Sequence, residues 1–226
     1  MEVSFMSNAK QIDQLLEGFL KRGLPGCGLK VVQYGNTLYE GYFGVTDIDT
    51  KTPVTKDTLF RQASMSKIPL YTVMMMLYER GKFLLTAPIG DYLPEWKTST
   101  RYDRHPNGYV DIVPTSRPIN IRDVMSMKCG LPYCNSAAPT HDLVMTGMQE
   151  CMQPLWEKGS YTLKEHLSAM SKAPLACDPG THWIYGFSSE LAAGIIEAVC
   201  DKPVNDVFKE MLFDPLGMKD TAAIFP

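Results

Sequence analysis

The stretch Ser64-Met65-Ser66-Lys67, followed by a long apolar run to Tyr78, decides how the fold of this chain is interpreted. A serine and a lysine three positions apart lie on the same face of a helix, one turn from each other. The run behind them is apolar on every side, which predicts a helix buried in the middle of its domain. A lysine at the head of a buried helix is costly unless another group pairs with it or uses it. This cost is the first indication of chemistry.

Pro69 fixes where this helix begins, because proline is tolerated near a helix start and not deep inside. We therefore expect the helix to begin close to Ser64, with the hydroxyl at the positive end of the helix dipole, where an oxyanion is stabilised. Lys67 would then be desolvated enough to lose its proton and act as a base. The structural alternative is that Ser64 is an ordinary helix cap. The same spacing from Ser7 to Lys10 lies in a polar segment and is interpreted as a solvated helix start.

The composition excludes several classes of function. A hydrophobic content of 45% and a charged content of 21% are typical of a soluble globular protein. A net charge of −3 without a basic stripe gives no case for nucleic acid, and no apolar run is long enough for a membrane helix. The six cysteines and four histidines have no metal-ligand spacing, so we expect no metal and no cofactor. The N-terminus lacks a signal-peptide pattern, which predicts a cytoplasmic chain with reduced cysteines.

Hydrophobic periodicity gives the expected elements. A helix is predicted over residues 8–22, and strands over 28–34 and 37–45 are joined by a hairpin turn at Gly35-Asn36. The polar, proline-rich residues 97–118 are predicted to be an irregular surface segment. Asn120 is expected to cap the next helix. That helix and the later ones are predicted over residues 119–127, 145–156, 162–170, 190–199 and 204–212.

The context of the Ser-x-x-Lys motif extends over most of the chain. It includes Phe60-Arg61-Gln62-Ala63 before the motif, and Gly81-Lys82-Phe83-Leu84-Leu85 and Pro88-Ile89-Gly90-Asp91-Tyr92-Leu93-Pro94-Glu95 after the apolar helix. Later strings are Lys128-Cys129-Gly130-Leu131-Pro132-Tyr133 and Phe213-Asp214-Pro215-Leu216-Gly217-Met218-Lys219-Asp220-Thr221. Together they resemble the serine β-lactamase-like superfamily, in particular class C β-lactamases and family VIII carboxylesterases, in which Ser-x-x-Lys carries the nucleophile. Cys129 stands where the superfamily usually has serine.

The resemblance implies an α+β fold of the β-lactamase/transpeptidase type, with an antiparallel sheet flanked by helices and a helical subdomain. The chain corresponds to the N-terminal part of such a domain. Residues 1–63 would supply a helix and the first sheet strands. Residues 64–226 would form a mainly helical region with the nucleophile helix and a tyrosine loop.

The superfamily's third motif, Lys-Thr-Gly or a His-x-Gly equivalent on a C-terminal strand, does not occur in the 226 residues. We therefore expect the sheet to be incomplete in this chain, with open edges. Three explanations compete: a second chain in the same particle supplies the missing strands, a partner completes a truncated gene product, or a self-contained domain has lost catalysis. We favour the first.

The resemblance also implies a catalytic tyrosine, often within Tyr-x-Asn. Tyr34-Gly35-Asn36 is explained by the hairpin turn, and Tyr133-Cys134-Asn135 follows Gly-Leu-Pro, where the superfamily places a pocket wall. Tyr185 lies in Trp183-Ile184-Tyr185-Gly186-Phe187-Ser188-Ser189-Glu190-Leu191, which resembles the Trp-x-Tyr-Ser-x-Ser-x-Asp-x-Leu pattern of family VIII esterases. We choose Tyr185, with Tyr133 as the alternative. A structural interpretation of Tyr185 is a buried aromatic residue whose hydroxyl has a partner.

Phe187 stands where β-lactamases have the asparagine that holds the substrate amide. Phenylalanine makes no hydrogen bond and would form an apolar wall, which favours an ester or an apolar acyl group over a β-lactam. Tyr133 and Cys134 are expected to line the substrate pocket beside it.

The resulting hypothesis is a serine hydrolase that acts on a small-molecule ester or amide. Ser64 attacks the acyl carbon, Lys67 or Tyr185 takes its proton, and Tyr185 protonates the leaving group before water hydrolyses the acyl-enzyme. The choice between the two bases stays open, because closely coupled groups titrate as a unit. A carboxylesterase is the leading hypothesis. The alternatives are a β-lactamase or D-Ala-D-Ala peptidase, and a non-catalytic binding protein of the same fold.

Overall fold

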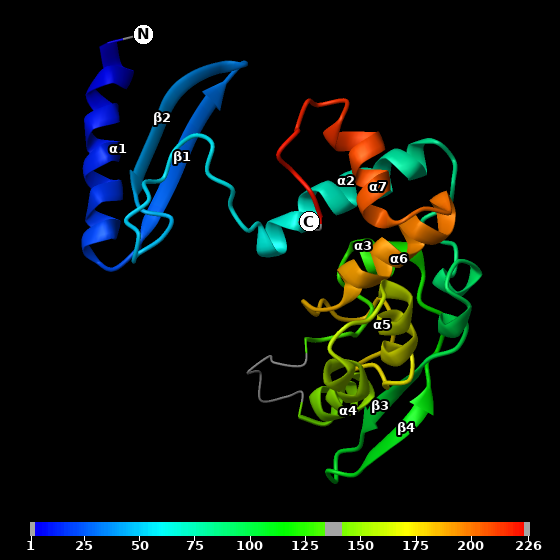
Figure 1. Ribbon diagram of the computed structural model, residues 1–226. Coiled ribbons are helices and arrows are strands. Elements are labelled where there is room, and N and C mark those ends of the chain that lie inside the picture. Colours follow the sequence, from blue (N-terminus) through cyan, green and yellow to red (C-terminus); the bar gives the residue numbers. More distant parts are fainter. Residues whose placement is uncertain (1–2, 134–141, 224–226) are drawn as a thin grey trace. The chain divides into compact units, whose positions relative to one another are not determined.

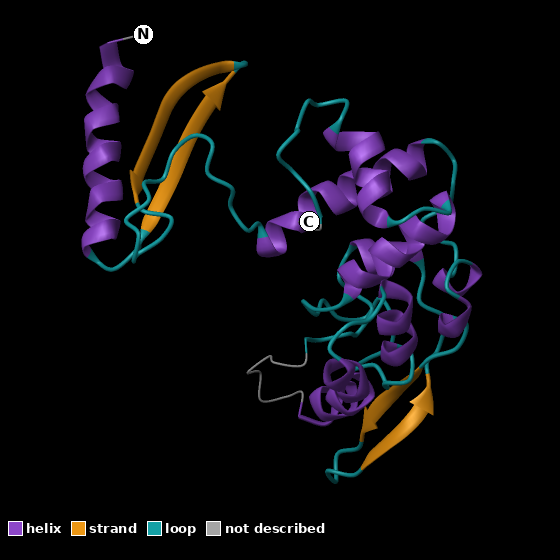
Figure 2. Cartoon of the chain, in the orientation of Figure 1, coloured by secondary structure: helices purple, strands orange, loops and turns teal. Residues whose placement is uncertain are grey.

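The structure, a computed structural model, describes residues 3–133 and 142–223. The chain divides into two compact units, Met1–Arg61 and Gln62–Pro226. Each unit is described by itself, and Figures 1 and 2 show the elements of both.

The first unit is a helix packed on a β-hairpin. Helix α1 spans Val3–Lys21, and strands β1 (Gly26–Gln33) and β2 (Asn36–Gly44) pair antiparallel. The buried Tyr39 of β2 donates a hydrogen bond of 2.6 Å to the Asp13 carboxylate of α1. Burial and this carboxylate raise the pKa of Tyr39 to about 12, so the phenol stays protonated. This hydrogen bond joins the helix to the hairpin on which it packs.

Two boundaries in this unit differ from the prediction. Helix α1 begins at Val3, upstream of the expected Asn8. The hairpin turn is formed by Tyr34 and Gly35, one residue before the predicted pair, and both residues have positive φ angles, 49° and 79°. Two left-handed residues in succession give the turn whose twist matches that of the strands. Asn36 is therefore already the first residue of β2.

The second unit is mainly helical. After a 3-10 turn at Ala63–Ser66 come α2 (Lys67–Glu79) and two short 3-10 turns, Ile89–Asp91 and Pro94–Trp96. The remaining elements, in chain order, are β3 (Thr100–Arg104), β4 (Val110–Pro114), α3 (Ile121–Met125), α4 (Asp142–Lys158), α5 (Leu163–Met170), α6 (Ser188–Cys200), α7 (Val204–Phe208) and a π-helical turn (Lys209–Phe213). The five later helices therefore lie close to their predicted ranges, and α7 ends early because its last turn widens into the π-helical turn.

Helix α2 is buried on one face only, so the prediction that it is buried all round was wrong. Leu70, Val73, Met74 and Leu77 point into the core, where α6 packs against α2. On the other side, Ile68 is 67% exposed and Met75 is 40% exposed. The helix is apolar on both sides, so either side could be buried. Among the described residues of this unit, other elements cover only the side that faces the core.

The prediction of an irregular segment over residues 97–118 was also wrong, because β3 and β4 form an antiparallel hairpin there. Its strands are half exposed and rich in charge, which hides the usual alternation. A distant segment supports the hairpin: the Tyr102 N–H donates to Leu175 O at 3.0 Å, and the Leu175 N–H donates to Thr100 O at 2.7 Å. This pairing joins residues more than seventy positions apart, so no local pattern announces it.

The cap predicted at Asn120 is confirmed. Its side chain accepts a hydrogen bond from the Asp123 N–H at 3.0 Å, and the Asp123 carboxylate accepts one from the Asn120 N–H at 2.9 Å. Two backbone donors at the start of α3 are thereby satisfied reciprocally.

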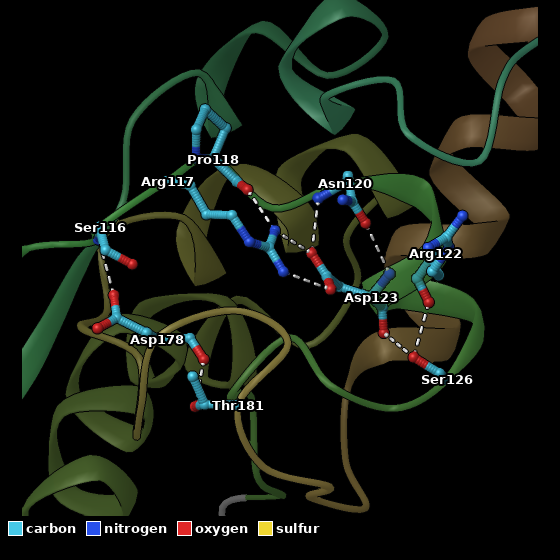
Figure 3. Close-up of polar contacts among 9 residues, drawn as sticks. All are labelled: Ser116, Arg117, Pro118, Asn120, Arg122, Asp123, Ser126, Asp178 and Thr181. Atoms are coloured by element: carbon cyan, nitrogen blue, oxygen red, sulfur yellow. Dashed lines mark hydrogen bonds and ion pairs between the residues drawn. The ribbon is translucent and has the colours of Figure 1, made fainter.

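The Asp123 carboxylate is the centre of a polar network that Figure 3 shows. Its side chain is only 5% exposed, and both oxygens accept hydrogen bonds from the Arg117 guanidinium, at 2.6 and 2.9 Å. Next to it, the Asp178 carboxylate accepts a hydrogen bond of 2.7 Å from the Ser116 N–H. The network connects the loop after β4, the start of α3 and the turn at Asp178.

In the described parts of the chain, membrane-spanning helices, metal-binding clusters and disulfide bonds are all absent. No helix there is both long and apolar enough to cross a membrane. The same residues contain no group of three or more His, Cys, Asp or Glu side chains that could hold a metal ion. The five cysteines in these ranges, Cys27, Cys129, Cys151, Cys177 and Cys200, are free thiols.

Replacing Asp123 with alanine should lower the free energy of unfolding by about 2–4 kcal/mol, because it removes the carboxylate that accepts from the Asn120 N–H and leaves the Arg117 guanidinium without its partner. Urea unfolding followed by circular dichroism measures the change. Lys209→Ala is the control, since its ion pair with Asp214 is exposed on both sides, and it should change stability by less than about 0.5 kcal/mol. Equal effects of the two variants would contradict the central role of Asp123.

Candidate active site

Ser64 lies in the 3-10 turn that precedes α2. The helix was expected to begin close to Ser64, but the regular helix begins only at Lys67, one turn later. The capping positions of the 3-10 turn and of α2 are Gln62 and Ser66, and neither side chain makes a capping hydrogen bond. Ser64 is therefore not a helix cap. Its hydroxyl is exposed, and its N–H is among the first donors of a helical segment, which lack partners within the helix.

Ala63, directly before Ser64, has a φ angle of 46°. This left-handed conformation costs an L-residue about 1–2 kcal/mol, and such strain clusters at functional sites. The backbone directly before the exposed Ser64 is thus held in a conformation that alanine rarely adopts.

Tyr185 contacts Ser64 directly. Its hydroxyl donates a hydrogen bond of 2.7 Å to Ser64 Oγ, across 121 positions of sequence. The half-buried Lys67 is on the same helix start as Ser64, and its Nζ lies 5.0 Å from the centre of the Tyr185 ring. The structure thus brings together the three residues that the sequence singled out as nucleophile, amine and phenol.

Tyr133 joins this group from a third segment. Lys67 Nζ donates a hydrogen bond of 3.1 Å to the Tyr133 hydroxyl, and the Tyr133 and Tyr185 rings meet edge to face with centroids 5.5 Å apart. Both candidate tyrosines therefore lie at Lys67, and only Tyr185 is hydrogen-bonded to Ser64. Cys134, expected in the pocket lining, lies outside the described residues.

Two chain segments place the tyrosines side by side. The Ile184 N–H donates to Met127 O at 2.9 Å, and the Phe187 N–H donates to Leu131 O at 3.0 Å. Pro132 and Gly186 form an antiparallel bridge next to the second of these hydrogen bonds. The backbones approach so closely that a Cβ on Gly186 would collide with the carbonyl oxygen of Leu131. Gly186 is thus required for the contact that holds Tyr185 beside Tyr133.

The polar network of Asp123 supports the same loop from behind. The Gly180 N–H donates to Lys128 O at 2.8 Å, and a Cβ on Gly180 would collide with the Arg117 guanidinium. Figure 3 shows Ser116, the neighbour of Arg117, bonded to Asp178 at the start of this turn. The turn that leads into the Tyr185 loop is therefore fixed at both backbone and side-chain level.

The charges at the site favour an ammonium beside an acidic phenol. Burial lowers the pKa of Lys67, but the phenol oxygens of Tyr133 and Tyr185 outweigh it and raise this pKa above its usual value. The pKa of Tyr185 is lowered by its contacts with Ser64 and Lys67. The prediction that Lys67 is desolvated enough to lose its proton was therefore wrong in direction. Lys67 stays positively charged and eases the loss of the Tyr185 proton.

Phe187 belongs to an aromatic wall behind Tyr133. Its ring lies 4.8 Å from that of Tyr133 and 5.7 Å from that of His166, both edge to face. Burial lowers the pKa of His166, which keeps its imidazole neutral against this wall. His166 was not predicted to belong to this wall, because the sequence around a single histidine on a helix does not indicate which distant residues it contacts.

Trp183 is a second residue that the sequence analysis left without a role. Its ring stacks on that of Tyr185, with centroids 6.2 Å apart and planes at 29°. Its position two residues before Tyr185 was the available signal. In an extended segment, residues two apart point to the same side.

Comparison with known proteins identifies related chains. Residues 12–225 match the family described as Beta-lactamase. The chain is 26% identical over 217 residues to Esterase EstB of Burkholderia gladioli, which covers 95% of this chain and 51% of that protein. It is 24% identical over 204 residues to the D-alanyl-D-alanine-carboxypeptidase/endopeptidase AmpH of Escherichia coli (strain K12), covering 90% of this chain and 46% of that protein.

Among solved structures, the chain is similar to EstCE1, described as a hydrolase with promiscuous acyltransferase activity. The TM-score is 0.76 at 24% identity, and the match covers 95% of this chain and 53% of that one. This likeness confirms the β-lactamase/transpeptidase-like α+β fold. The chain spans about half the length of the curated relatives it matches.

Gly186→Ala should displace the Tyr185 loop, because the new methyl group has no room beside Leu131 O. We expect a loss of about 1–3 kcal/mol in the free energy of unfolding, as for other overpacked sites. Thermal unfolding measures it. The control is Gly18→Ala on α1, where a Cβ meets no atom within 4 Å and alanine favours the helix. A Gly186→Ala protein as stable as the Gly18→Ala protein would contradict the close approach.

Proposed function

Because this chain belongs to the Beta-lactamase family, whose members are serine hydrolases, we propose that it is a carboxylesterase that forms an acyl-enzyme on Ser64. The observation that carries the proposal is the 2.7 Å contact between the Tyr185 hydroxyl and Ser64 Oγ, with Lys67 beside both. A nucleophile within hydrogen-bond reach of a base, and a third group that tunes that base, is the usual arrangement of covalent catalysis.

In the acylation step, Tyr185 is the base. As a phenolate stabilised by the Lys67 ammonium, it takes the proton of Ser64 while Oγ bonds to the ester carbonyl carbon. The N–H of Ser64 is placed to donate to the carbonyl oxygen, which becomes negative. When the bond between the carbonyl carbon and the alcohol oxygen breaks, Tyr185 returns the proton to that oxygen. The alcohol then leaves.

Deacylation repeats these transfers with water. Tyr185 takes a proton from the water molecule, whose oxygen attacks the acyl carbon. The bond to Ser64 Oγ breaks, and the proton returns to the serine. Lys67 keeps its charge throughout, because its two phenol neighbours raise its pKa.

The aromatic wall favours an ester with an apolar acyl group. The Phe187 ring packs against Tyr133 and His166 and offers no hydrogen bond to a substrate amide. A substrate amide, such as the side-chain amide of a penicillin, would find no hydrogen-bond partner in this ring, which costs binding free energy. An apolar acyl chain has no hydrogen-bonding groups, so it gives up no hydrogen bond when it binds at such a surface.

Ser64→Ala should abolish ester hydrolysis in the full-length protein, with kcat for p-nitrophenyl butyrate falling by roughly a thousandfold or more. Labelling by a fluorescent fluorophosphonate should disappear with it. Ser66→Ala is the matched control, since Ser66 lies in the same exposed turn and its side chain makes no capping bond. Retained turnover in Ser64→Ala would remove the proposal. Turnover of nitrocefin in preference to the ester would identify a β-lactamase, and no labelling of the wild type would identify a binding protein.

The pH profile of kcat/KM tests the roles of Tyr185 and Lys67. Activity should rise with pH as Tyr185 loses its proton, at a pH below the value of about 10 of an ordinary tyrosine. It should fall again where Lys67 loses its charge. Tyr133→Phe removes a phenol that raises the pKa of Lys67, so the falling limb should move to lower pH. A falling limb that does not move, or a rising limb that persists in Tyr185→Phe, would contradict these roles.

A further inference from the structure

An open cavity of about 330 Å³ adjoins the candidate active site through Trp183. One face of the Trp183 ring stacks on Tyr185, whose hydroxyl contacts Ser64. The Trp183 side chain is 64% exposed, so much of its surface is available to a ligand. This space, here named the Trp183 cavity, is therefore linked to the reacting hydroxyl groups by the stacked rings of Trp183 and Tyr185.

The lining of the Trp183 cavity is mostly apolar and comes from three elements. Tyr102 of β3 and Val144 of α4 face Ala176 and Ile184 of the loop that leads to Tyr185. Arg104 and His182 are exposed residues of the same lining. A volume near 300 Å³ with apolar and aromatic walls is at the small end of sites that bind organic ligands. It suits one aromatic ring with a short linker.

We propose that the Trp183 cavity binds the alcohol portion of the substrate, and that the preferred alcohols carry an aromatic ring, as in arylmethyl esters. This inference rests on the proposed function. Tyr185 protonates the leaving oxygen, so that oxygen must lie within hydrogen-bond distance of the Tyr185 hydroxyl when its bond to carbon breaks. The group attached to the oxygen therefore starts at Tyr185. The large exposed aromatic surface adjoining Tyr185 is Trp183.

The acyl portion is assigned to a different surface. Tyr133 and Phe187 form the wall beside Lys67, with ring centroids 4.8 Å apart, and neither residue lines the Trp183 cavity. Tyr185 contacts both surfaces, through its edge-to-face contact with Tyr133 and its stack with Trp183. The acyl and alcohol portions of the ester would therefore bind on two different surfaces that both contact Tyr185, the residue that protonates the leaving alcohol. Offset stacking on Trp183 favours an aromatic alcohol over an alkyl alcohol of equal size.

The test compares benzyl butyrate with ethyl butyrate in the full-length protein. The acyl groups are identical and the two alcohols are similar leaving groups, so the ratio of their kcat/KM values reports binding of the ring. We expect the wild type to prefer the benzyl ester about tenfold or more, and Trp183→Ala to lose most of that preference because kcat/KM falls much further for the benzyl ester than for the ethyl ester. Trp183→Phe should keep an intermediate preference. Trp156→Ala is the matched control, because Trp156 is 40% exposed on α4 and does not line the cavity.

Three outcomes would overturn the inference. The first is a benzyl preference that Trp183→Ala leaves unchanged. The second is an equal loss for both esters, which would mean that Trp183 only supports Tyr185. The third is that Trp183→Ala changes the preference for the length of the acyl chain among esters of the same alcohol, which would assign the cavity to the acyl group. In each case the hydrolysis itself, and its dependence on Ser64, would still support the proposed function.

A binding measurement tests the cavity without turnover. The chain has three tryptophans, so 5-fluorotryptophan labelling gives three ¹⁹F resonances, and Trp183→Phe assigns one of them. Benzyl alcohol should shift the Trp183 resonance in a saturable manner, while ethanol at the same concentration should not. An unchanged Trp183 resonance would overturn the inference. If no ester is hydrolysed and the shift is still seen, the proposed function fails and the site for aromatic alcohols remains.

Discussion

The close pairing of two backbone segments, residues 127–132 and 184–187, is the constraint on which the candidate site depends. It places Tyr133 and Tyr185 next to each other, and it is possible only because residue 186 has no side chain. Three separate stretches of sequence then meet, the helix start with Ser64 and Lys67 and the segments that carry Tyr133 and Tyr185. The turn that leads into this pairing is held by Lys128, which accepts from the Gly180 N–H, and by Ser116, which donates to Asp178 and lies directly before Arg117, the partner of the buried Asp123. A stabilising network and a reactive group are thus connected through one short loop. The geometry of the hydroxyl pair is therefore a property of the tertiary structure and not of any one motif.

Much of this structure was predictable where the information is local. The Ser-x-x-Lys spacing, the apolar helix and the position of Tyr185 in its Trp-x-Tyr context indicated which residues come together. The cap at Asn120 was predictable because a capping residue and its partner lie three positions apart. Features that depend on distant partners were missed. The β3–β4 hairpin is supported by Leu175, and the aromatic wall contains His166 from α5, and neither contact leaves a periodic trace in the sequence.

The charge state of Lys67 shows the same limit in energetic terms. Burial alone predicts a lowered pKa, which was the basis of the expectation that this lysine is neutral. The structure adds two phenol oxygens close to Nζ, and these outweigh burial. A cation then shares the site with a phenol that has become easier to deprotonate. The sequence identified both residues, but the sign of the shift depends on distances that only the fold supplies.

The left-handed conformation of Ala63 has a consequence for how this protein could be made more heat-resistant. Glycine or asparagine adopts such a backbone more easily than alanine, so selection for thermal endurance alone would favour replacing Ala63. The same replacement would give the backbone before Ser64 more conformational freedom, because glycine and asparagine populate more backbone conformations than alanine. At this position, thermal stability favours a residue other than alanine, while a fixed direction of Ser64 favours alanine. Ala63 is therefore a compromise between stability and reactivity.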